Sequence, residues 1–337
     1  MGRKLRLGIA GCGDIAGFMA LVSRLVPAVH LAACCDVDPV RSARFARKHR
    51  IPRQSNNFAE MIHESGLDAV YLAVPHHLHY EMIRLAVEKR IPVLVEKPLT
   101  RTLAEARSLM PLIEAAGVKV GVNYQYRYDN ACYTLARWMQ HGVVGRISSV
   151  RINIPWARQS GYFEQSAWHR TIEQAGGGTL LTQGSHFLDI VLWGLGDQPE
   201  SAQGYSSHFK FQDVEVEDLA HGIVRMQNGA LVQIASSMAV ATEQAVSIEV
   251  YGSIGTAIYG NFPFPHIKLI GAKRITERLP VLGVHALQRS LAGFAAWVLE
   301  DTPFLIPASS AVPVLAAVEA IYRSSGSGQR EAVEAFA

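Results

Sequence analysis

Short apolar segments alternate with amphipathic helical patterns through the first 124 residues of the chain. Helix-length connections between successive apolar strands are typical of βαβ units, in which the strands run parallel and helices cover both faces of the sheet. The alternation therefore predicts an α/β fold whose N-terminal domain is built on a parallel sheet. The predicted strands are 5–11, 30–36, 67–75, 91–98 and 118–124, and the helices between them include 38–49, 78–90 and 103–117.

The pattern changes in the second half of the chain. Strand candidates in residues 204–269 are separated by turn residues, including Asn228-Gly229, a pair typical of tight β-hairpins. Helical patterns cover residues 176–196 before these strands and 285–325 after them. We predict a second α/β domain with an open, mostly antiparallel sheet. The two predicted domains are residues 1–124 and residues 125–337.

The composition excludes several classes of protein. Apolar residues make up 49% of the chain and charged residues 18%, which is typical of a compact globular protein. No apolar run approaches the roughly 18 residues of a membrane span. The net charge of +3 comes without the dense Lys/Arg block that binds nucleic acid. The four cysteines lack metal-ligand spacing, so we expect free thiols in a reducing cytoplasm.

A glycine-rich turn joins the first predicted strand to the first helix. The stretch "GCGDIA" at 11–16 fits the G-x-G-x-x-A pattern. Gly11 permits a tight turn, Gly13 lets the backbone approach a pyrophosphate, and the helix that begins at Asp14 and Ile15 offers free N–H groups to it. This position after a strand and before a helix predicts a dinucleotide-binding Rossmann domain.

An acidic residue stands where such a domain binds ribose. Asp36 ends the second predicted strand, and a carboxylate there accepts hydrogen bonds from the ribose hydroxyls of NAD and repels a 2′-phosphate. We therefore expect NAD as the cofactor. Arg41 and Arg44 are close enough in sequence to soften the repulsion, so NADP stays possible.

Further polar residues follow the next strands, at the edge of a parallel sheet where ligands bind. His76, His77 and His79 raise a metal hypothesis, but no Cys or acidic residue of suitable spacing joins them, so we predict no metal. We expect this turn to line the nicotinamide pocket instead. The cofactor-binding residues predicted in these segments are Ala73, Pro75, His79, Glu96, Lys97 and Asn123.

Two residues have the chemistry that oxidation of an alcohol requires, a cation for the developing alkoxide and a base for the hydroxyl proton. Lys97 directly follows a buried strand, although an ion pair with Glu96 is an alternative role. His186 shares a helix face with Thr182 and Asp189, at spacings of four and three residues, although a lone histidine on an apolar helix is often a core residue. We take Lys97, His186 and Thr182 as the catalytic candidates.

The motifs together resemble the Gfo/Idh/MocA family, the glucose-fructose oxidoreductase and inositol dehydrogenase group. The resemblance extends over nearly the full chain, and "EKP" combined with the glycine turn is its most specific part. The residues that carry it are "GIAGCGDIA" at 8–16, "AVPHHLHYE" at 73–81, "VLVEKPLT" at 93–100, "VGVNYQYRYD" at 120–129, "GGGTLLTQGSHFLDI" at 176–190 and "IEVYGSIGT" at 248–256.

The resemblance implies NAD(P)-dependent oxidation or reduction of a sugar, cyclitol or nucleotide sugar. It makes Lys97 the residue that engages the reacting hydroxyl and His186 the acid/base. Many members have Asp where this chain has Thr182, and Thr cannot offset an imidazolium charge. "TQGSH" and the aromatic stretch 155–170 resemble members that act on nucleotide-linked sugars. The predicted substrate residues are Lys97, Tyr124, Arg127, Arg158, Trp168, Arg170, Gln183 and His186.

Alternatives stay open for the charges and for the function. Arg158 or Arg170 would grip a phosphate, or pair only with Glu164 or Glu173. A redox-neutral glycosidase-like enzyme of the same family and a non-catalytic nucleotide-sensing protein are the other candidate functions, and the presence of both catalytic candidates argues against a sensor. Apolar alternation in the predicted sheet leaves a second face to cover, so we expect a homodimer or homotetramer.

Overall fold

The computed structural model describes residues 3–64, 66–159 and 161–334, which pack as two compact units. The first unit comprises residues 1–128 and 280–309, and the second comprises residues 129–279 and 310–337. Sequence analysis assigned residues 280–309 to the C-terminal domain, but by packing they belong to the first unit.

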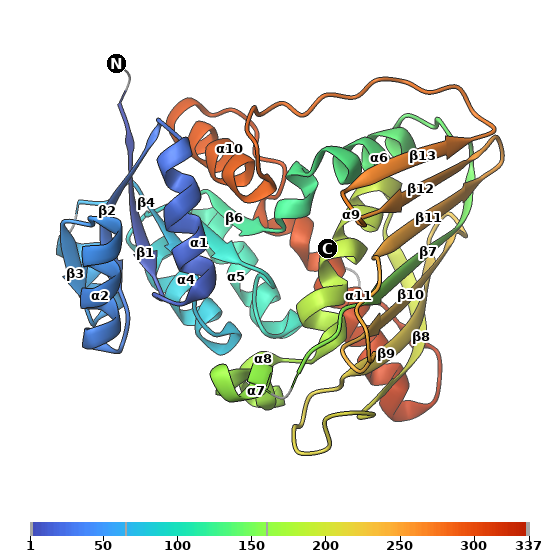
Figure 1. Cartoon of the computed structure of the whole chain (residues 1–337), viewed down its shortest axis with the longest axis horizontal. Helices are drawn as coiled ribbons and strands as arrows, with labels where there is room; N and C mark the ends of the chain where they lie inside the picture. Colours follow the sequence, from blue (N-terminus) through green and yellow to red (C-terminus); the bar gives the residue numbers. More distant parts are fainter. Residues whose placement is uncertain (1–2, 65, 160, 335–337) are drawn as a thin grey trace. The chain divides into compact units, whose positions relative to one another are not determined.

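The first unit contains a six-stranded sheet in the order β3-β2-β1-β4-β5-β6, and every pair of neighbours in it is parallel (Figure 1). This order is that of the doubly wound dinucleotide-binding fold, in which ligands bind outside the carboxyl ends of the strands. The predicted N-terminal Rossmann domain is therefore confirmed. The strands are β1 (Leu5–Ala10), β2 (Val29–Cys35), β3 (Arg53–Ser55), β4 (Ala69–Leu72), β5 (Val93–Glu96) and β6 (Val120–Asn123).

Two helices of this unit, α2 (Pro39–His49) and α5 (Leu103–Ala116), begin at residues whose side chains cap them. Asp38 accepts from the amides of Val40 and Arg41 at the start of α2, and Thr102 forms a capping box with Glu105 at the start of α5. Helices that connect successive strands are what a parallel sheet requires. Those of this unit are α1 (Asp14–Val22), α2 (Pro39–His49), α3 (Phe58–Glu64), α4 (His79–Glu88) and α5 (Leu103–Ala116). A further helix, α10 (Ala286–Glu300), belongs to residues 280–309.

Close packing explains why residues 280–309 belong to the first unit. The amide of Val122 donates to the carbonyl of Ile306 at 3.0 Å. A Cβ at Gly121 would come within 2.6 Å of the ring of Phe304, so only glycine leaves room for that ring. Periodicity identifies α10 as a helix but does not reveal which sheet it packs against.

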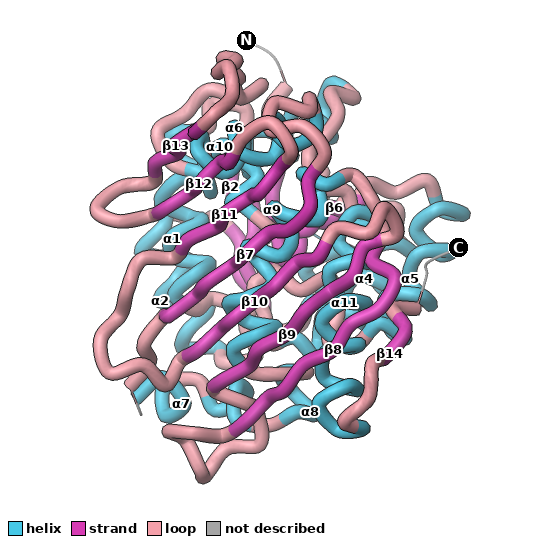
Figure 2. Tube along the Cα trace, turned by 90° about the vertical axis from the view of Figure 1, so that its right-hand side faces the viewer, coloured by secondary structure: helices cyan, strands magenta, loops and turns pink. Residues whose placement is uncertain are grey.

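The second unit contains an eight-stranded sheet in the order β13-β12-β11-β7-β10-β9-β8-β14 (Figure 2). Only β7 and β10 pair in parallel, so the prediction of a mostly antiparallel sheet is confirmed. The Asn228-Gly229 pair does connect two antiparallel strands, with Gly229 at φ +89°. The strands are β7 (Ile147–Pro155), β8 (Pro199–Ser207), β9 (Leu219–Met226), β10 (Leu231–Ser237), β11 (Ser247–Gly252), β12 (Thr256–Gly260), β13 (His266–Ile270) and β14 (Glu331–Ala332).

Helices pack against one face of this sheet. In Figure 2 the strands lie in front, and α6, α9 and α11 lie behind them. Gly204 and Gly222 lack a Cβ where Ile321 of α11 approaches, which lets the helix lie close to β8 and β9. The helices of the second unit as a whole are α6 (Asn130–Gln140), α7 (Gly161–Gln165), α8 (Ile172–Ala175), α9 (Ser185–Leu195) and α11 (Ala308–Ser327). Within the described ranges, the structure has no helix that is long and apolar enough to span a membrane.

Candidate functional site

The glycine turn of the first unit leaves a helix N-terminus open. Gly11 has φ +85°, and a Cβ there would overlap the carbonyl oxygen of Ala73. Gly13 precedes α1 without a side-chain cap, and a Cβ there would meet no atom within 4 Å. Asp14 and Ile15, the first residues of α1, are exposed. The turn thus offers free N–H groups and space beside them, which fits the pyrophosphate of a dinucleotide.

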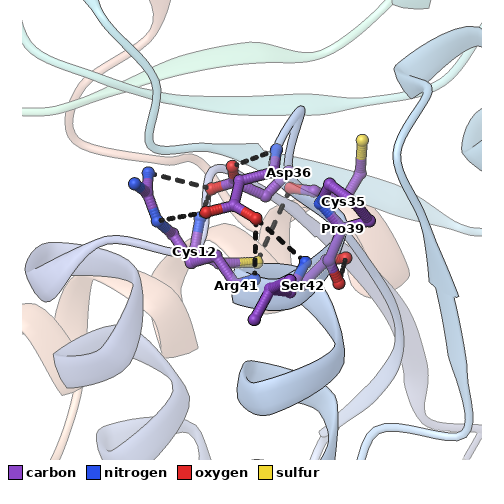
Figure 3. A network of polar contacts seen from close by, with 8 residues as sticks. Cys12, Cys35, Asp36, Pro39, Arg41 and Ser42 are labelled. Atoms are coloured by element: carbon purple, nitrogen blue, oxygen red, sulfur yellow. Dashed lines mark hydrogen bonds and ion pairs between the residues drawn. The ribbon is translucent and has the colours of Figure 1, made fainter.

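Asp36 connects this turn to the end of β2. Its carboxylate accepts from the amide of Cys12 at 2.9 Å and from the amide of Asp38 at 3.0 Å. Figure 3 shows these contacts together with Arg41, whose guanidinium lies 3.7 Å from the carboxylate. A carboxylate has about four lone-pair sites, so acceptor capacity remains for ribose hydroxyls. The predicted ribose-binding residue is therefore held by the glycine turn itself.

His79 holds two strand-end turns together. The side chain is fully buried, with Nδ1 2.9 Å from the carbonyl oxygen of Pro98 and Nε2 3.0 Å from that of Val74. Burial lowers the pKa of His79 to about 4. Both ring nitrogens face the protein's own carbonyl groups, so His79 fixes the turns that contain Pro75 and Lys97. No group of three His, Cys, Asp or Glu residues suited to a metal occurs in the described ranges.

Glu96 and Asn123 belong to a buried network at the carboxyl ends of β4, β5 and β6. Glu96 Oε1 accepts from the hydroxyl of Tyr71 and, at 2.7 Å, from Asn123 Nδ2. Asn123 Oδ1 accepts from the hydroxyl of Ser290 in α10 at 2.8 Å. Burial raises the pKa of the Glu96 carboxyl. These predicted cofactor residues thus contact one another and their neighbours, and orient the strand ends from inside the unit.

Lys97 is the partly exposed residue of the "EKP" segment. It lies between Glu96 and Pro98, which are both buried, and it follows the last residue of β5 directly. The Lys97–Pro98 peptide bond is cis. The positive charge of Lys97 opposes the rise that burial causes in the pKa of Glu96, and it adds to the fall that burial causes in the pKa of His79. Lys97 therefore stands at the carboxyl end of the sheet, where the sequence predicted it.

In the second unit, a buried carboxylate closes the start of the helical segment that contains His186. Glu217 accepts from the amide of Gly178 at 2.6 Å, from the amide of Leu180 at 2.8 Å and from the hydroxyl of Tyr322 at 2.9 Å. A Cβ at Gly178 would overlap the Glu217 carbonyl oxygen. Burial raises the pKa of Glu217 to about 7. Sequence analysis did not single out Glu217, because its partners Gly178 and Tyr322 lie in segments that are remote in the sequence.

The residues before His186 form a π-helical turn, Leu180–Gly184, which continues into α9. Such turns are rare and occur often at functional sites. The hydroxyl of Thr182 donates to the carbonyl of Gly178 at 2.7 Å. His186 is buried in the first turn of α9. The predicted helix is confirmed, but its spacing is not that of an uninterrupted α-helix.

Gln183 has an amide group that the protein satisfies only in part. Its side chain is 3% exposed, and Oε1 accepts from the hydroxyl of Thr179 at 3.2 Å. Within the described ranges, Nε2 is buried and has no hydrogen-bond partner. A buried donor of this kind is costly unless a ligand or water accepts from it. The predicted substrate residue Gln183 therefore has a donor available.

Tyr162 connects the aromatic stretch 155–170, whose residue 160 is outside the described ranges, to the π turn. Burial raises its pKa to about 12, while hydrogen bonding to Thr182 and the charge of Arg158 act in the opposite direction. The guanidinium of Arg158 lies 5.4 Å from the centre of the Tyr162 ring. Sequence analysis did not single out Tyr162, since nothing in the sequence marks it among the four aromatic residues of that stretch.

Arg170 and Trp168 are engaged by neighbouring side chains. Arg170 pairs with Asp213 at 2.7 Å, so its partner is neither Glu164 nor Glu173 as the sequence suggested. Trp168 stacks on His169 with ring centroids 3.6 Å apart. The Trp168 ring also packs against a buried cluster of Phe163, Ala175, Phe211, Val214, Val216 and Met238.

The remaining substrate candidates, Tyr124 and Arg127, lie in the interior of the first unit. Tyr124 is 1% exposed and Arg127 is 2% exposed. Arg127 donates to the carbonyl of Leu305 at 2.7 Å and so fastens residues 280–309 to the unit.

Comparisons with known proteins identify the family of the chain. A family described as "Oxidoreductase family, NAD-binding Rossmann fold" matches residues 5–124, and the "GFO/IDH/MocA C-terminal domain" matches residues 133–258. The 1,5-anhydro-D-fructose reductase of Ensifer adhaerens is 25% identical over 98% of this chain and 98% of its own. The scyllo-inositol 2-dehydrogenase (NAD(+)) of Bacillus subtilis (strain 168) is 26% identical over 81% of this chain and 79% of its own.

Solved structures share the fold. The WlbA dehydrogenase from Bordetella pertussis, in complex with NADH and UDP-GlcNAcA, has a TM-score of 0.89 at 23% identity, over 99% of this chain and 100% of its own. Levoglucosan dehydrogenase, in complex with NADH and L-sorbose, has a TM-score of 0.88 at 18% identity, over 98% of this chain and 99% of its own. The predicted family, oxidoreductase class and NAD cofactor are thereby confirmed. The chain belongs to the Gfo/Idh/MocA family of oxidoreductases with an NAD-binding Rossmann fold.

Proposed function

We propose that this protein transfers a hydride between NAD and a secondary hydroxyl, or the corresponding ketone, of a sugar, cyclitol or nucleotide sugar. The observation that carries the proposal is an open helix N-terminus at Gly13 with the Asp36 carboxylate beside it, in the same unit as Lys97. When bound there, NAD supplies the hydride acceptor. The printed names of relatives, among them an anhydrofructose reductase and an inositol dehydrogenase, favour polyhydroxylated substrates.

In this proposal three side chains act directly on the substrate, namely Lys97, His186 and Gln183. The Lys97 ammonium stabilises alkoxide character at the reacting oxygen and orients the alcohol. His186 exchanges the hydroxyl proton. Thr182 donates its own proton to the carbonyl of Gly178, so it holds the turn in shape and does not balance charge on His186. Gln183 Nε2, which is buried, donates to a substrate oxygen.

A panel assay tests the proposal. The purified protein is incubated with NAD and, separately, with neutral sugars, inositols, sugar acids and nucleotide sugars, while absorbance of reduced nicotinamide is recorded. Formation of NADH with at least one class, together with the keto product, supports the proposal. Glycoside cleavage without net NADH identifies the redox-neutral alternative. Tight NAD binding without any turnover across the panel favours the nucleotide-sensing alternative.

We also propose that the protein forms a homodimer or homotetramer through the face of the eight-stranded sheet opposite α9 and α11. Outward-facing apolar side chains there are unusually exposed, with Tyr205 at 69%, Ile223 at 49% and Leu231 at 46%. A sheet face of this kind is commonly covered by another subunit. Light scattering at micromolar concentration measures the assembly. A monomer contradicts the proposal, and Ile223→Glu is expected to weaken the assembly.

The state of the cysteines is informative about the cellular compartment of the protein. Cys12, Cys34, Cys35 and Cys132 are all buried and free. Buried free thiols suit a reducing compartment, and we propose the cytoplasm. Cell fractionation with an antibody against the protein tests this, and recovery with secreted proteins contradicts it.

A further inference from the structure

Helix α1 is apolar on every side, although one side of it faces solvent. Its sequence DIAGFMALV has a single charged residue, Asp14, at the first position. A helix of this composition is normally enclosed by protein. The inner side of α1 is buried, but Phe18 is 40% exposed, Leu21 is 47% exposed and Leu25, just after the helix, is 55% exposed. Their spacings of three and four residues place these side chains in one stripe.

Helix α2 of the same unit shows the usual alternative. Its exposed residues include Arg41, Arg44, Arg47 and Lys48, whereas Phe45 is buried. This is the charged outer side expected of a helix that faces water. The apolar outer side of α1 therefore needs another explanation, and contiguous exposed apolar side chains commonly mark a surface that binds another molecule.

A second segment of the first unit extends this surface. Leu282 is 91% exposed and Val284 is 82% exposed. The amide of Val284 donates to Gln288 Oε1 at 2.9 Å, and Gln288 Nε2 donates to the carbonyl of Leu25 at 3.0 Å. Gln288 thus joins the two segments. We define the α1 patch as Phe18, Leu21, Leu25, Leu282 and Val284.

Further contacts fix the shape of the α1 patch. The ring of His285 lies edge-on to the ring of Phe18, with centroids 4.9 Å apart. The guanidinium of Arg289 donates twice to the carbonyl of Gly283, at 2.7 and 2.9 Å. The two segments are therefore ordered before any partner arrives, which lowers the entropic cost of binding one.

Opposite charges lie at the two ends of the stripe. Asp14 and Arg24 are both exposed, and in the part of the chain that the structure describes neither forms an ion pair. Ten residues of helix separate them by about 15 Å. When two copies of α1 pack antiparallel about a two-fold axis, the stripe meets itself and each Asp14 faces the end that carries the partner subunit's Arg24. Antiparallel helix dipoles also attract each other.

We propose that a second copy of this chain docks on the α1 patch, with helix α1 against helix α1 of the partner subunit. The complementarity of the stripe and its end charges to themselves suits an isologous contact between copies. A standard interface takes about 800 Å² from each partner, and five large side chains of this exposure provide a substantial part of that area.

This contact is distinct from the sheet-face contact proposed above. The α1 patch belongs entirely to the first unit, and the eight-stranded sheet belongs to the second. One isologous contact joins two chains, and a second one joins two such dimers into a tetramer. The α1 patch therefore decides between the dimer and the tetramer.

Light scattering of matched variants tests the α1 contact. Leu21→Glu places a carboxylate in the α1 patch, and Ile223→Glu places one on the sheet face. Leu112→Glu is the control, because Leu112 is 43% exposed on α5, outside the α1 patch. Thermal unfolding and NAD titration of each variant should match the wild type, since all three side chains are exposed, and this shows that a change in mass is not due to misfolding.

The wild type should be a tetramer at micromolar concentration, Leu21→Glu and Ile223→Glu should each be dimers, and the double variant should be a monomer. The dissociation constant of the α1 contact should rise about 100-fold or more in Leu21→Glu, because two unpaired carboxylates would be buried in it. Arg24→Glu should raise it about 10-fold, since each new carboxylate faces an Asp14. Leu112→Glu should stay tetrameric.

The other outcomes are equally informative. A dimeric wild type that becomes monomeric in Leu21→Glu supports the α1 contact and contradicts the sheet-face contact. A Leu21→Glu protein with the mass of the wild type, or a monomeric wild type, overturns the α1 contact. Sedimentation of the wild type with phosphatidylcholine vesicles, lost in Leu21→Glu, would identify a lipid surface as the occupant and would also overturn it.

Discussion

Two glycine-rich turns in this molecule precede helices, but they differ in what lies at the helix N-terminus. At the turn before α1, the amides of the helix start have no side-chain cap, and the Asp36 carboxylate lies beside them on Cys12. At the turn before the π segment, the carboxylate of Glu217 itself accepts from the amides of Gly178 and Leu180. The first helix N-terminus is left for a ligand, and the second is filled by the protein. A glycine-rich turn is therefore not by itself a nucleotide site.

The glycines of the two turns differ for the same reason. A Cβ at Gly13 would project into open space, whereas a Cβ at Gly178 would overlap the carbonyl oxygen of Glu217. Gly178 is thus required by how the chain packs, whereas at Gly13 the packing leaves room for a side chain, and our proposal assigns that room to the dinucleotide. Substitutions at the two positions should separate binding from stability.

The largest effect is expected from Gly178→Ala. The added methyl group collides with main-chain and carboxylate atoms of Glu217, so the free energy of unfolding should fall by about 3 kcal/mol or more. Gly13→Ala should leave that free energy within about 1 kcal/mol but weaken NAD binding. Urea denaturation and NAD titration of both variants measure the contrast. Gly326→Ala in α11, where a Cβ meets nothing within 4 Å, is the control. Equal stability of Gly178→Ala and wild type would contradict the packing role.

The Glu217 carboxyl should make stability depend on pH. Its pKa of about 7 exceeds the usual 4.5, so the folded protein holds this proton more tightly than the unfolded chain does. The resulting stabilisation is full below pH 4.5 and is lost as the pH rises through 7, by up to about 3 kcal/mol.

Glu96 and His79 also make stability depend on pH, and they do so in the wild type and in Glu217→Gln alike. The difference between these two proteins therefore isolates the contribution of Glu217. Unfolding free energies measured from pH 4.5 to 7 should fall less steeply in Glu217→Gln than in the wild type. Glu215→Gln, two residues earlier and exposed, should keep the wild-type slope. Identical slopes in the wild type and Glu217→Gln would show that the buried carboxyl keeps an ordinary pKa.

A smaller effect is expected at the open turn. Asp36→Ala removes the acceptor for the ribose hydroxyls and the hydrogen bond to Cys12, so NAD affinity should fall about 10-fold. NADP affinity should rise relative to NAD, because Arg41 remains and the repelling carboxylate is gone. Titration of both nucleotides measures the ratio. Tighter NADP than NAD binding in the wild type would contradict the assigned role of Asp36.

The first unit could be predicted further from sequence than the second because its site residues follow contiguous motifs. The glycine turn, Asp36 and Lys97 are all positioned by the strand that precedes each of them. The side chains that shape the second unit come from distant segments: Tyr322 reaches Glu217 across 105 residues, and Glu217 reaches Gly178 across 39. Periodicity contains no information about such pairs.

Several predicted site residues also have structural roles. His79, Glu96 and Asn123, which the sequence predicts to contact the cofactor, are each buried and bonded to neighbouring protein groups. Arg127, which the sequence predicts to contact substrate, fastens residues 280–309. A polar residue near a strand end faces either the ligand or the interior, and the choice depends on packing from segments that are remote in sequence.

The central claim is that Lys97 acts on the substrate hydroxyl, and kinetics of Lys97→Met test it most directly. Turnover on the substrate found in the panel should fall about 10²-fold or more, the scale of a lost positioned catalytic group, while the Kd for NAD changes little. His186→Ala should act similarly, and Lys89→Met, at the exposed end of α4, should match the wild type. If Lys97→Met retains near-normal turnover with unchanged NAD binding, Lys97 only supports the fold and the proposed mechanism is wrong.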